Sequence, residues 1–247
     1  MLRPTESAED HHLHHHPEPL RIIPSAHSVT RRGMLGASAA LAGVVLTGGV
    51  LPAWAQKGAR PTSQETLGPF YPIDVPADQD ADLTIIAGHK DHALGQIVYV
   101  SGKVTDMKGA PVPNATLEIW QANAAGRYAH PADQSKSPLD ENFQGFARIR
   151  TGADGTYSFK TIKPAAYPTG EGDWMRPPHI HFDVRGRASR ITTQMYFEGE
   201  ALNEKDRLLQ SHSKGGRDSM MSRTIALSGQ QERDAKAVSW DIVLIAG

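Results

Sequence analysis

Runs in which apolar and polar residues alternate recur along the chain from residue 97 to the C-terminus. Alternation with a period of two places successive side chains on opposite faces of an extended segment, so each run predicts a β-strand. The runs that follow this pattern are Ile97–Val104, Thr116–Gln121, Gly145–Arg150, Thr156–Ile162, His179–Val184, Ile191–Phe197 and Val238–Ile245.

Segments rich in Gly, Pro, Asn and Asp separate many of these runs, as in Asp106–Gly109, Pro111–Asn114 and Gly152–Gly155. Tight turns of this composition join neighbouring strands that run antiparallel. Only Asn203–Gln210 has a helical pattern. The sequence therefore predicts the all-β class, with an antiparallel two-sheet β-sandwich as its architecture.

Residues 56–92 contain many Pro, Asp and Ala residues and follow neither the helical nor the strand period. A segment without a period offers no continuous apolar face for a helix or strand to bury. We therefore expect an extended N-terminal arm that wraps the core of the β-domain.

Arg31 and Arg32 stand shortly before an Ala- and Gly-rich apolar run, and small residues at Ala53 and Ala55 follow that run. This order is typical of a twin-arginine export signal. The alternative is a transmembrane anchor, for which the run is just long enough, but its glycines make it only mildly hydrophobic. We therefore expect no stable membrane anchor.

The export signal divides the chain into two parts. We expect residues 1–55 to be a leader and twin-arginine segment that is removed. Residues 56–247 then form one mature domain, located in the periplasm or outside the cell.

The composition narrows the classes of function. The chain has 26 basic and 27 acidic residues, a formal net charge of -1, which provides no positive field for nucleic acid, so we expect no such partner. It contains no Cys, which rules out disulfides, thiolate nucleophiles, Cys-bound zinc and iron–sulfur clusters. A metal would have to be bound by His, carboxylate or phenolate groups.

His179 and His181 form the strongest candidate for such a site. In a strand they point to the same face, whereas Ile180 and Phe182 point into the opposite, apolar layer. Pro177 and the proline after it keep the approach extended, because proline fixes φ and disfavours helix in the residue before it. When the motif is taken alone, two histidines on the polar face of a half-exposed strand are the commoner explanation.

Further motifs accompany the histidine pair in a fixed order. They are Thr66–Tyr71 (TLGPFY), Leu117–Asn123 (LEIWQAN) running into Gly126–Tyr128 (GRY), then Tyr167, then Arg176–His181 (RPPHIH). Together they resemble the intradiol ring-cleavage dioxygenases, and most of all the catalytic, iron-binding subunits of protocatechuate 3,4-dioxygenases. The resemblance extends over about Thr62 to Phe197.

The resemblance implies that the cofactor is Fe(III) and that its ligands are Tyr128, Tyr167, His179 and His181. This set is chemically reasonable, because Fe(III) is a hard cation that favours anionic oxygen together with imidazole. For any one of these tyrosines taken alone, packing in the core or on the surface is the commoner explanation.

The implied reaction cleaves a catechol-type ring between its two hydroxyl carbons, with both atoms of O2 entering a muconate-type diacid. The resemblance implies that Tyr167 is the ligand that leaves the iron and takes up a substrate proton. The resemblance also implies that Arg176 stabilises a carbanion-like form of the substrate. Gln194 resembles a residue beside the His ligands, although a solvated strand face explains it nearly as well.

The resemblance also indicates which partners the protein has. The resemblance implies a catechol-type substrate and O2, and leaves open either a homo-oligomer or a second subunit without metal ligands.

The leading alternative to an enzyme is a non-catalytic exported β-sandwich module, and the pattern of Ile97–Ile162 fits such a module well. A His-ligated zinc hydrolase is a more distant alternative, because the sequence offers no convincing nucleophile or general base.

Overall fold

The computed structural model describes residues 59–229, 232 and 234–247. The predicted leader and export signal, residues 1–55, lie outside the described residues. The strands are β1 (Ile97–Asp106), β2 (Thr116–Trp120), β3 (Phe146–Arg150), β4 (Thr156–Ile162), β5 (Tyr167–Pro168), β6 (Met175–Arg176), β7 (His179–Arg185), β8 (Arg190–Phe197), β9 (Met221–Ile225), β10 (Lys236–Ser239) and β11 (Ile242–Leu244). The helical elements are η2 (Ala201–Lys205), α1 (Arg207–Ser211) and α2 (Lys214–Met220).

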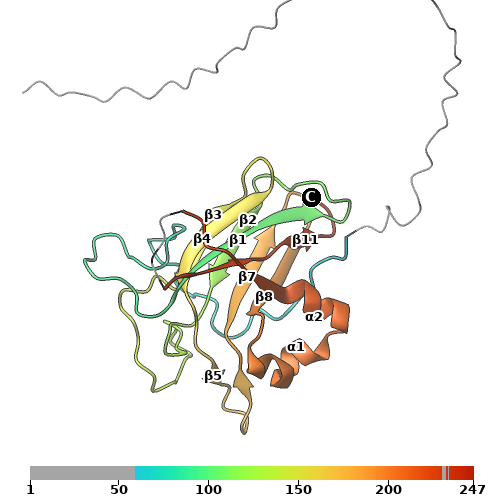
Figure 1. The fold of residues 1–247 in the computed structure, drawn as a ribbon. Helices are drawn as coiled ribbons and strands as arrows, with labels where there is room; N and C mark the ends of the chain where they lie inside the picture. The colour runs from blue at the N-terminus through green and yellow to red at the C-terminus, as the bar shows by residue number, and fades with distance from the viewer. Residues whose placement is uncertain (1–58, 230–231, 233) are drawn as a thin grey trace, which may run out of the picture. The chain divides into compact units, whose positions relative to one another are not determined.

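Most strands belong to one large sheet, and the predicted all-β class is confirmed (Figure 1). Its strand order is β11-β1-β10-β9-β8-β7-β2-β3, and β4 pairs with β1 outside this path. β5 and β6 form a separate two-stranded ribbon. Within the described residues, no helix is both long and apolar enough to span a membrane.

The sheet is mixed, so the prediction of a purely antiparallel two-sheet sandwich is wrong in this respect. β1 runs parallel to both β10 and β11, and β8 runs parallel to β9. β9 pairs with β8 and with β10 and thereby joins the two halves into one curved, barrel-like sheet. The parallel β8–β9 pair is explained by the long connection through η2, α1 and α2, because parallel neighbours need a crossover rather than a tight turn.

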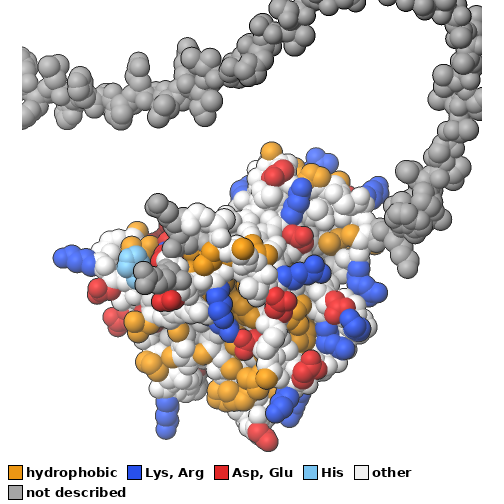
Figure 2. All heavy atoms as spheres, in the orientation of Figure 1, with side chains coloured by type: hydrophobic (Ala, Val, Ile, Leu, Met, Phe, Trp, Pro, Cys, Tyr) orange, Lys and Arg blue, Asp and Glu red, His pale blue; other side chains and the backbone are white. Residues whose placement is uncertain are grey.

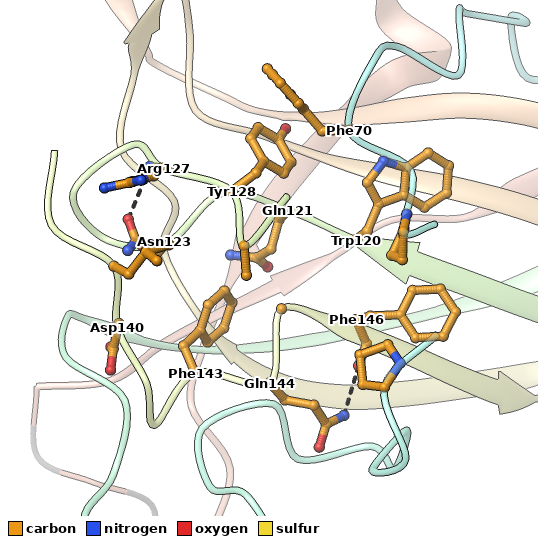
Figure 3. A pocket seen from close by; sticks show the side chains of 15 residues that line it. Phe70, Trp120, Gln121, Asn123, Arg127, Tyr128, Asp140, Phe143, Gln144 and Phe146 are labelled. Atoms are coloured by element: carbon orange, nitrogen blue, oxygen red, sulfur yellow. Dashed lines mark hydrogen bonds between the residues drawn. The ribbon is translucent and has the colours of Figure 1, made fainter. Parts of the chain in front are cut away.

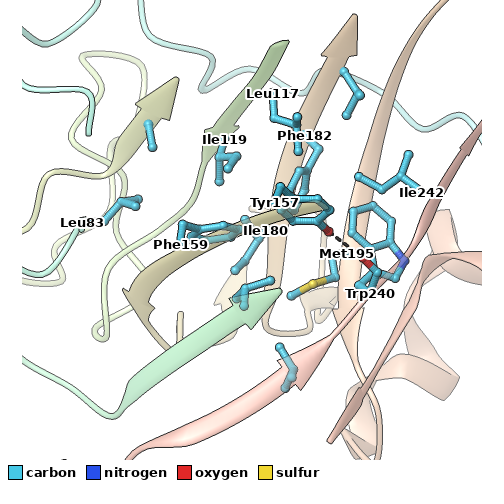
Figure 4. Packing of buried hydrophobic residues seen from close by; sticks show 14 of the residues in the cluster. Leu83, Leu117, Ile119, Tyr157, Phe159, Ile180, Phe182, Met195, Trp240 and Ile242 are labelled. Atoms are coloured by element: carbon cyan, nitrogen blue, oxygen red, sulfur yellow. Dashed lines mark hydrogen bonds between the residues drawn. The ribbon is translucent and has the colours of Figure 1, made fainter. Parts of the chain in front are cut away.

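The hydrophobic core lies between the two halves of this sheet (Figure 4). The ring of Phe182 on β7 packs against Tyr157 and Phe159 of β4 and against Trp240, with ring centroids 6.4, 5.9 and 4.9 Å apart. Other fully buried members of the cluster are Leu117, Ile119, Ile180, Met195 and Ile242. The predicted apolar face of the histidine strand is therefore confirmed, since Ile180 and Phe182 are both in the core.

The predicted arm is confirmed for the residues that the structure describes, 59–92, which contain no helix and no strand. The arm binds both halves of the sheet through its backbone. The Thr62 amide donates to the Val243 carbonyl of β11 at 3.0 Å, and the Glu65 amide donates to the Thr192 carbonyl of β8 at 2.9 Å. The side chain of Leu83 is completely buried in the core.

The helical region differs from the prediction of one helix over Asn203–Gln210. It is divided at Asp206, whose backbone is extended (φ -74°, ψ 114°) and whose carboxylate caps α1 by accepting from the Leu208 amide. Helix α2 was not predicted, because the glycines at its start are poor helix formers. A Cβ on one of them, Gly215, would lie 2.8 Å from the Arg60 guanidinium carbon of the arm, so the arginine side chain would have to shift to make room.

Figure 2 shows that lysine, arginine and acidic side chains alternate over the visible face of the molecule, with apolar side chains between them. Neither sign of charge forms a continuous field on this face. This mixture of charges agrees with the nearly equal numbers of basic and acidic residues in the chain, 26 and 27.

Candidate metal centre and active site

The candidate site lies on the face of β7 that points away from the core. His181 is paired with Trp120 on β2 and with Gln194 on β8, while His179 is paired with Tyr196 on β8. Directly opposite residues of neighbouring strands project to the same face. The rings confirm this arrangement: Trp120 stacks on His181 with centroids 4.9 Å apart, and Tyr196 stacks on His179 at 5.8 Å.

The two histidines present one nitrogen each toward the other. Their Nε2 atoms lie 3.2 Å apart, and Nδ1 of His179 lies 2.7 Å from the Pro177 carbonyl oxygen. A carbonyl oxygen can only accept, so Nδ1 carries the proton and Nε2 of His179 holds a lone pair, as a metal-binding imidazole requires.

Both imidazoles are uncharged at neutral pH. Burial, and then the nearby charge of Arg176, lower the pKa of His181 to about 3. Burial, Arg176 and His181 lower the pKa of His179 well below its ordinary value. Neutral imidazole is the form that binds metal ions.

The two predicted tyrosine ligands lie beside these nitrogens. The Tyr167 hydroxyl oxygen is 3.4 Å from Nε2 of His179. The Tyr128 ring meets the Tyr167 ring edge-on at 5.6 Å and the His181 ring at 6.1 Å. The structure therefore brings all four predicted metal ligands together, although they come from three separate parts of the sequence.

Local backbone geometry explains how the two tyrosine segments meet. Gly126 has a φ of 76°, and a Cβ at this position would lie 2.7 Å from the Ala166 carbonyl oxygen. Only glycine combines this conformation with so close an approach. Tyr167 is in turn held opposite Arg176 by the pairing of β5 with β6.

The donor atoms fit Fe(III) better than other common metals. The buried Tyr128 hydroxyl has no hydrogen-bond partner among the described residues, although buried polar groups normally have one. Burial raises the pKa of Tyr128 well above 10 and also raises that of Tyr167, so the phenolates need a cation to form. The described part of the chain has no cluster of three or more His, Cys, Asp or Glu residues that could hold a metal ion, so phenol oxygens would have to complete any site here.

Arg176 is buried beside the ligands and makes three hydrogen bonds. Its Nε donates to Asp206 at 3.0 Å, and its Nη2 donates to Gln194 at 2.6 Å and to the Tyr196 hydroxyl at 2.9 Å. Burial alone would lower the pKa of Arg176, but Tyr196, Tyr167 and Asp206 outweigh it, so the net pKa is raised and the guanidinium stays charged.

Gln194 is completely buried, so the alternative of a solvated strand face is wrong. Its amide oxygen accepts from Arg176 and from the Tyr196 hydroxyl, and its Nε2 donates to the Thr66 carbonyl at 3.1 Å. Gln194 therefore connects the arm to the guanidinium of Arg176.

The arm segment Thr66–Tyr71 forms part of the wall of the site. A Cβ on Gly68, which has a φ of 73°, would lie 3.3 Å from Cε1 of His181, so the backbone passes close to that ring. Phe70 stacks on Tyr128 with centroids 4.5 Å apart, and Tyr71 donates to Glu118 at 2.9 Å.

Aromatic residues also enclose a small cavity next to Tyr128 (Figure 3). Its volume of about 40 Å³ holds one or two water molecules at most. An open groove of about 450 Å³ also has Tyr128 in its wall, together with Arg127 and His130. The groove has room for a ring-sized ligand, but Tyr167, His179 and His181 are not among the residues that line it.

Some neighbours of the predicted ligands and of Arg176 were not themselves predicted as site residues. Trp120, Phe70 and Tyr196 each contact a predicted ligand, and Asp206 contacts Arg176. Tyr196 could have been found from strand alternation, because it lies two residues after Gln194 and shares its face. Asp206 had no comparable signal, since it lies 30 residues from its partner.

Comparisons with known proteins agree with this geometry. A family model described as Dioxygenase matches residues 67–246. The chain is 43% identical over 185 residues to the protocatechuate 3,4-dioxygenase beta chain of Burkholderia cepacia, covering 73% of this chain and 78% of that protein. It is 35% identical over 143 residues to catechol 1,2-dioxygenase 1 of Acinetobacter lwoffii, covering 53% of this chain but only 40% of the relative.

A solved structure shows the same fold. The dioxygenase domain of a carbohydrate-binding fusion protein from Streptomyces sp. SirexAA-E is 25% identical, with a TM-score of 0.57, over 76% of this chain and 100% of that domain. The chain belongs to the intradiol ring-cleavage dioxygenases, as its motifs predicted, and is an oxidoreductase of that class. The family generally uses non-haem iron.

Substitution of Gly126 by Ala tests whether close approach of the two tyrosine segments builds the site. We expect Gly126→Ala to lose most of its capacity to bind iron, because the new Cβ would push the Tyr128 and Tyr167 segments apart. Gly109→Ala is the matched control, since Gly109 has a φ of 80° and nothing within 4 Å of its Cβ position. The Gly109→Ala variant should be less stable by only about 1–2 kcal/mol, because alanine disfavours a positive φ, and it should bind iron normally. Equal iron content per chain in both variants would contradict the account.

Proposed function

We propose that this chain is a non-haem Fe(III) dioxygenase that cleaves a catechol-type ring between its two hydroxyl carbons to give a muconate-type diacid. The observation that carries the proposal is the meeting of the two histidine Nε2 atoms, 3.2 Å apart, with the Tyr167 oxygen 3.4 Å from one of them. The ring of Tyr128 lies beside His181, and its hydroxyl has no hydrogen-bond partner among the described residues. The names of the relatives, which act on protocatechuate and catechol, support a catechol-type substrate.

Four residues would hold the iron: Nε2 of His179, Nε2 of His181, and the phenol oxygens of Tyr128 and Tyr167. When bound, Fe(III) would stabilise the phenolate and catecholate oxygens and make the substrate ring reactive toward O2. The buried ring of Trp120 packs against His181, and the half-buried ring of Phe70 packs against Tyr128, so that they shield one side of the site from water.

Tyr167 is the residue that we expect to move a proton. A catechol that binds through both oxygens must release two protons. If iron holds Tyr167 as a phenolate, its oxygen can take one of them, and the other would pass to solvent. Tyr167 is only half-buried and stands on the two-stranded ribbon, whereas Tyr128 is 3% exposed. Because burial raises the pKa of Tyr167, its phenol oxygen would keep a proton that it takes up there.

Arg176 and Gln194 act on the charge that develops on the substrate. Arg176 lies opposite Tyr167 in the β5–β6 ribbon, and its guanidinium remains positively charged, so it can stabilise negative charge on the ring as the ring is attacked. Gln194 touches the guanidinium and the arm, and we assign to it the role of keeping Arg176 in place.

We also propose that the enzyme works as an oligomer, either with further copies of this chain or with a second subunit that lacks metal ligands. The Burkholderia cepacia relative is the beta chain of its enzyme, which supports the second form. Static light scattering and mass analysis of the purified enzyme distinguish the two forms.

Oxygen consumption with a set of catechols tests the proposed reaction. The iron-loaded protein should consume one O2 per ring, and with ¹⁸O2 both labelled atoms should appear in a diacid. His181→Ala should lose iron and activity together, whereas His89→Ala should keep both, because His89 is exposed. An aldehyde-containing product from cleavage beside the two hydroxyls, or no oxygen consumption with any catechol, would contradict the proposal.

Visible spectra of two tyrosine variants test the roles of the two phenols. Tyr167→Phe should keep much of the iron and remain coloured through Tyr128, yet turn over slowly because its proton acceptor is gone. Tyr128→Phe should lose iron or colour both before and after anaerobic addition of catechol. If Tyr128 proves to be the one released by substrate, the two roles are reversed. If neither variant changes the spectrum, the iron–tyrosinate assignment is wrong.

Export remains a proposal that rests on the sequence of residues 1–55. We propose that the twin-arginine pair directs the folded enzyme out of the cytoplasm, with residues 56–247 as the mature domain. Arg31→Lys combined with Arg32→Lys should leave the precursor inside the cell, as measured by fractionation and immunoblotting. Normal secretion of the double variant would contradict the assignment.

A further inference from the structure

Asp206 is the buried anionic partner of Arg176. Its side chain is completely inaccessible, and its two oxygens have different tasks. Oδ2 accepts from Nε of Arg176 at 3.0 Å, and Oδ1 accepts from the Leu208 amide at 2.9 Å. Among the described residues, Asp206 makes the only salt bridge to Arg176.

The guanidinium of Arg176 is thereby fixed along one side. Nε is bound to Asp206, and the two N–H groups of Nη2 are bound to Gln194 and Tyr196. Nη1 makes no hydrogen bond to any described residue. Because the guanidinium is planar and rigid, fixing Nε and Nη2 also fixes the direction of Nη1.

We propose that Asp206 is a positioning residue for ring cleavage, which holds Arg176 so that Nη1 stays free to meet negative charge on the substrate. The inference rests on the proposed function and extends it to the helical region, which lies outside the recognised motifs. A buried guanidinium without its counter-ion would turn toward other acceptors or toward water, because an unpaired buried charge is strongly unfavourable. Arg176 would then no longer present Nη1 to the site.

Capping of α1 alone does not explain an aspartate at this position. Ser caps helices about as well as Asp, and Ser213 caps the neighbouring α2 by accepting from the Gly216 amide. A carboxylate is needed at position 206 only for the contact with Arg176. Asp206→Ser therefore separates the two tasks, since it keeps a capping oxygen and removes the ion pair.

The first readout is independent of activity. In the iron-free protein, the Nε–H of Arg176 should give a resolved NMR signal that exchanges slowly with water, because it is buried and bound. Asp206→Ser should shift this signal and speed its exchange. Ser213→Ala removes a helix cap without touching Arg176 and should leave the signal unchanged. Asp206→Asn, which keeps the size of the side chain, serves as the second variant if Asp206→Ser does not fold.

The second readout is turnover of the iron-loaded enzyme. Asp206→Ser should lower kcat by about 10–100-fold at normal iron content, as for other groups that orient an active-site residue. The KM for catechol should change by less than about 3-fold, because the interaction is made with the reacting substrate rather than on binding. Ser213→Ala should keep the kcat of the wild type.

A double-mutant comparison decides whether Asp206 acts through Arg176. In an Arg176→Lys background, Asp206→Ser should lower kcat by less than about 2-fold, because the guanidinium that Asp206 holds is already absent. An equal loss in both backgrounds, or an unchanged Nε–H signal in Asp206→Ser, would overturn the inference. If the wild-type enzyme cleaves no catechol, the proposed function fails, while the NMR readout still decides whether Asp206 holds Arg176.

Discussion

Two uncharged imidazoles buried side by side are the arrangement on which the rest of the site depends. Nε2 of His179 and Nε2 of His181 lie 3.2 Å apart, and the Pro177 carbonyl fixes the tautomer that leaves a lone pair on the first. Burial and the charge of Arg176 keep both rings neutral. Polar groups buried in this way are costly unless something satisfies them, and a cation between the two nitrogens and the neighbouring phenols would do so.

The fold supports this arrangement from three sides. The row Trp120–His181–Gln194 crosses β2, β7 and β8 and holds the histidine strand at the middle of one sheet face. The β5–β6 ribbon brings Tyr167 and Arg176 to the edge of that face. The arm covers it, with Gly68 against His181 and Phe70 against Tyr128. A site assembled from distant segments in this way depends on the global fold rather than on any single motif.

The sequence was sufficient for the parts that local periodicity and motif spacing determine. Alternation placed Ile180 and Phe182 in the core and the histidines on the other face, and the motifs identified the four residues that meet at the site. It was not sufficient where distant contacts decide. The parallel pairing of β10 and β11 with β1 depends on how the C-terminal segment returns to the sheet. The break of the predicted helix at Asp206 depends on a partner on β6, and the glycines of α2 lie against the side chains of Arg60 and Ser63 of the arm.

The central claim is that two imidazoles and two phenolates of this chain bind one Fe(III) ion. A crystal structure of the iron-loaded protein, with anomalous difference density recorded at the iron absorption edge, tests it most directly. The account predicts one anomalous peak bonded to Nε2 of His179, Nε2 of His181, and the phenol oxygens of Tyr128 and Tyr167. A peak bound elsewhere, or a metal held by the histidines without either tyrosine, would contradict it.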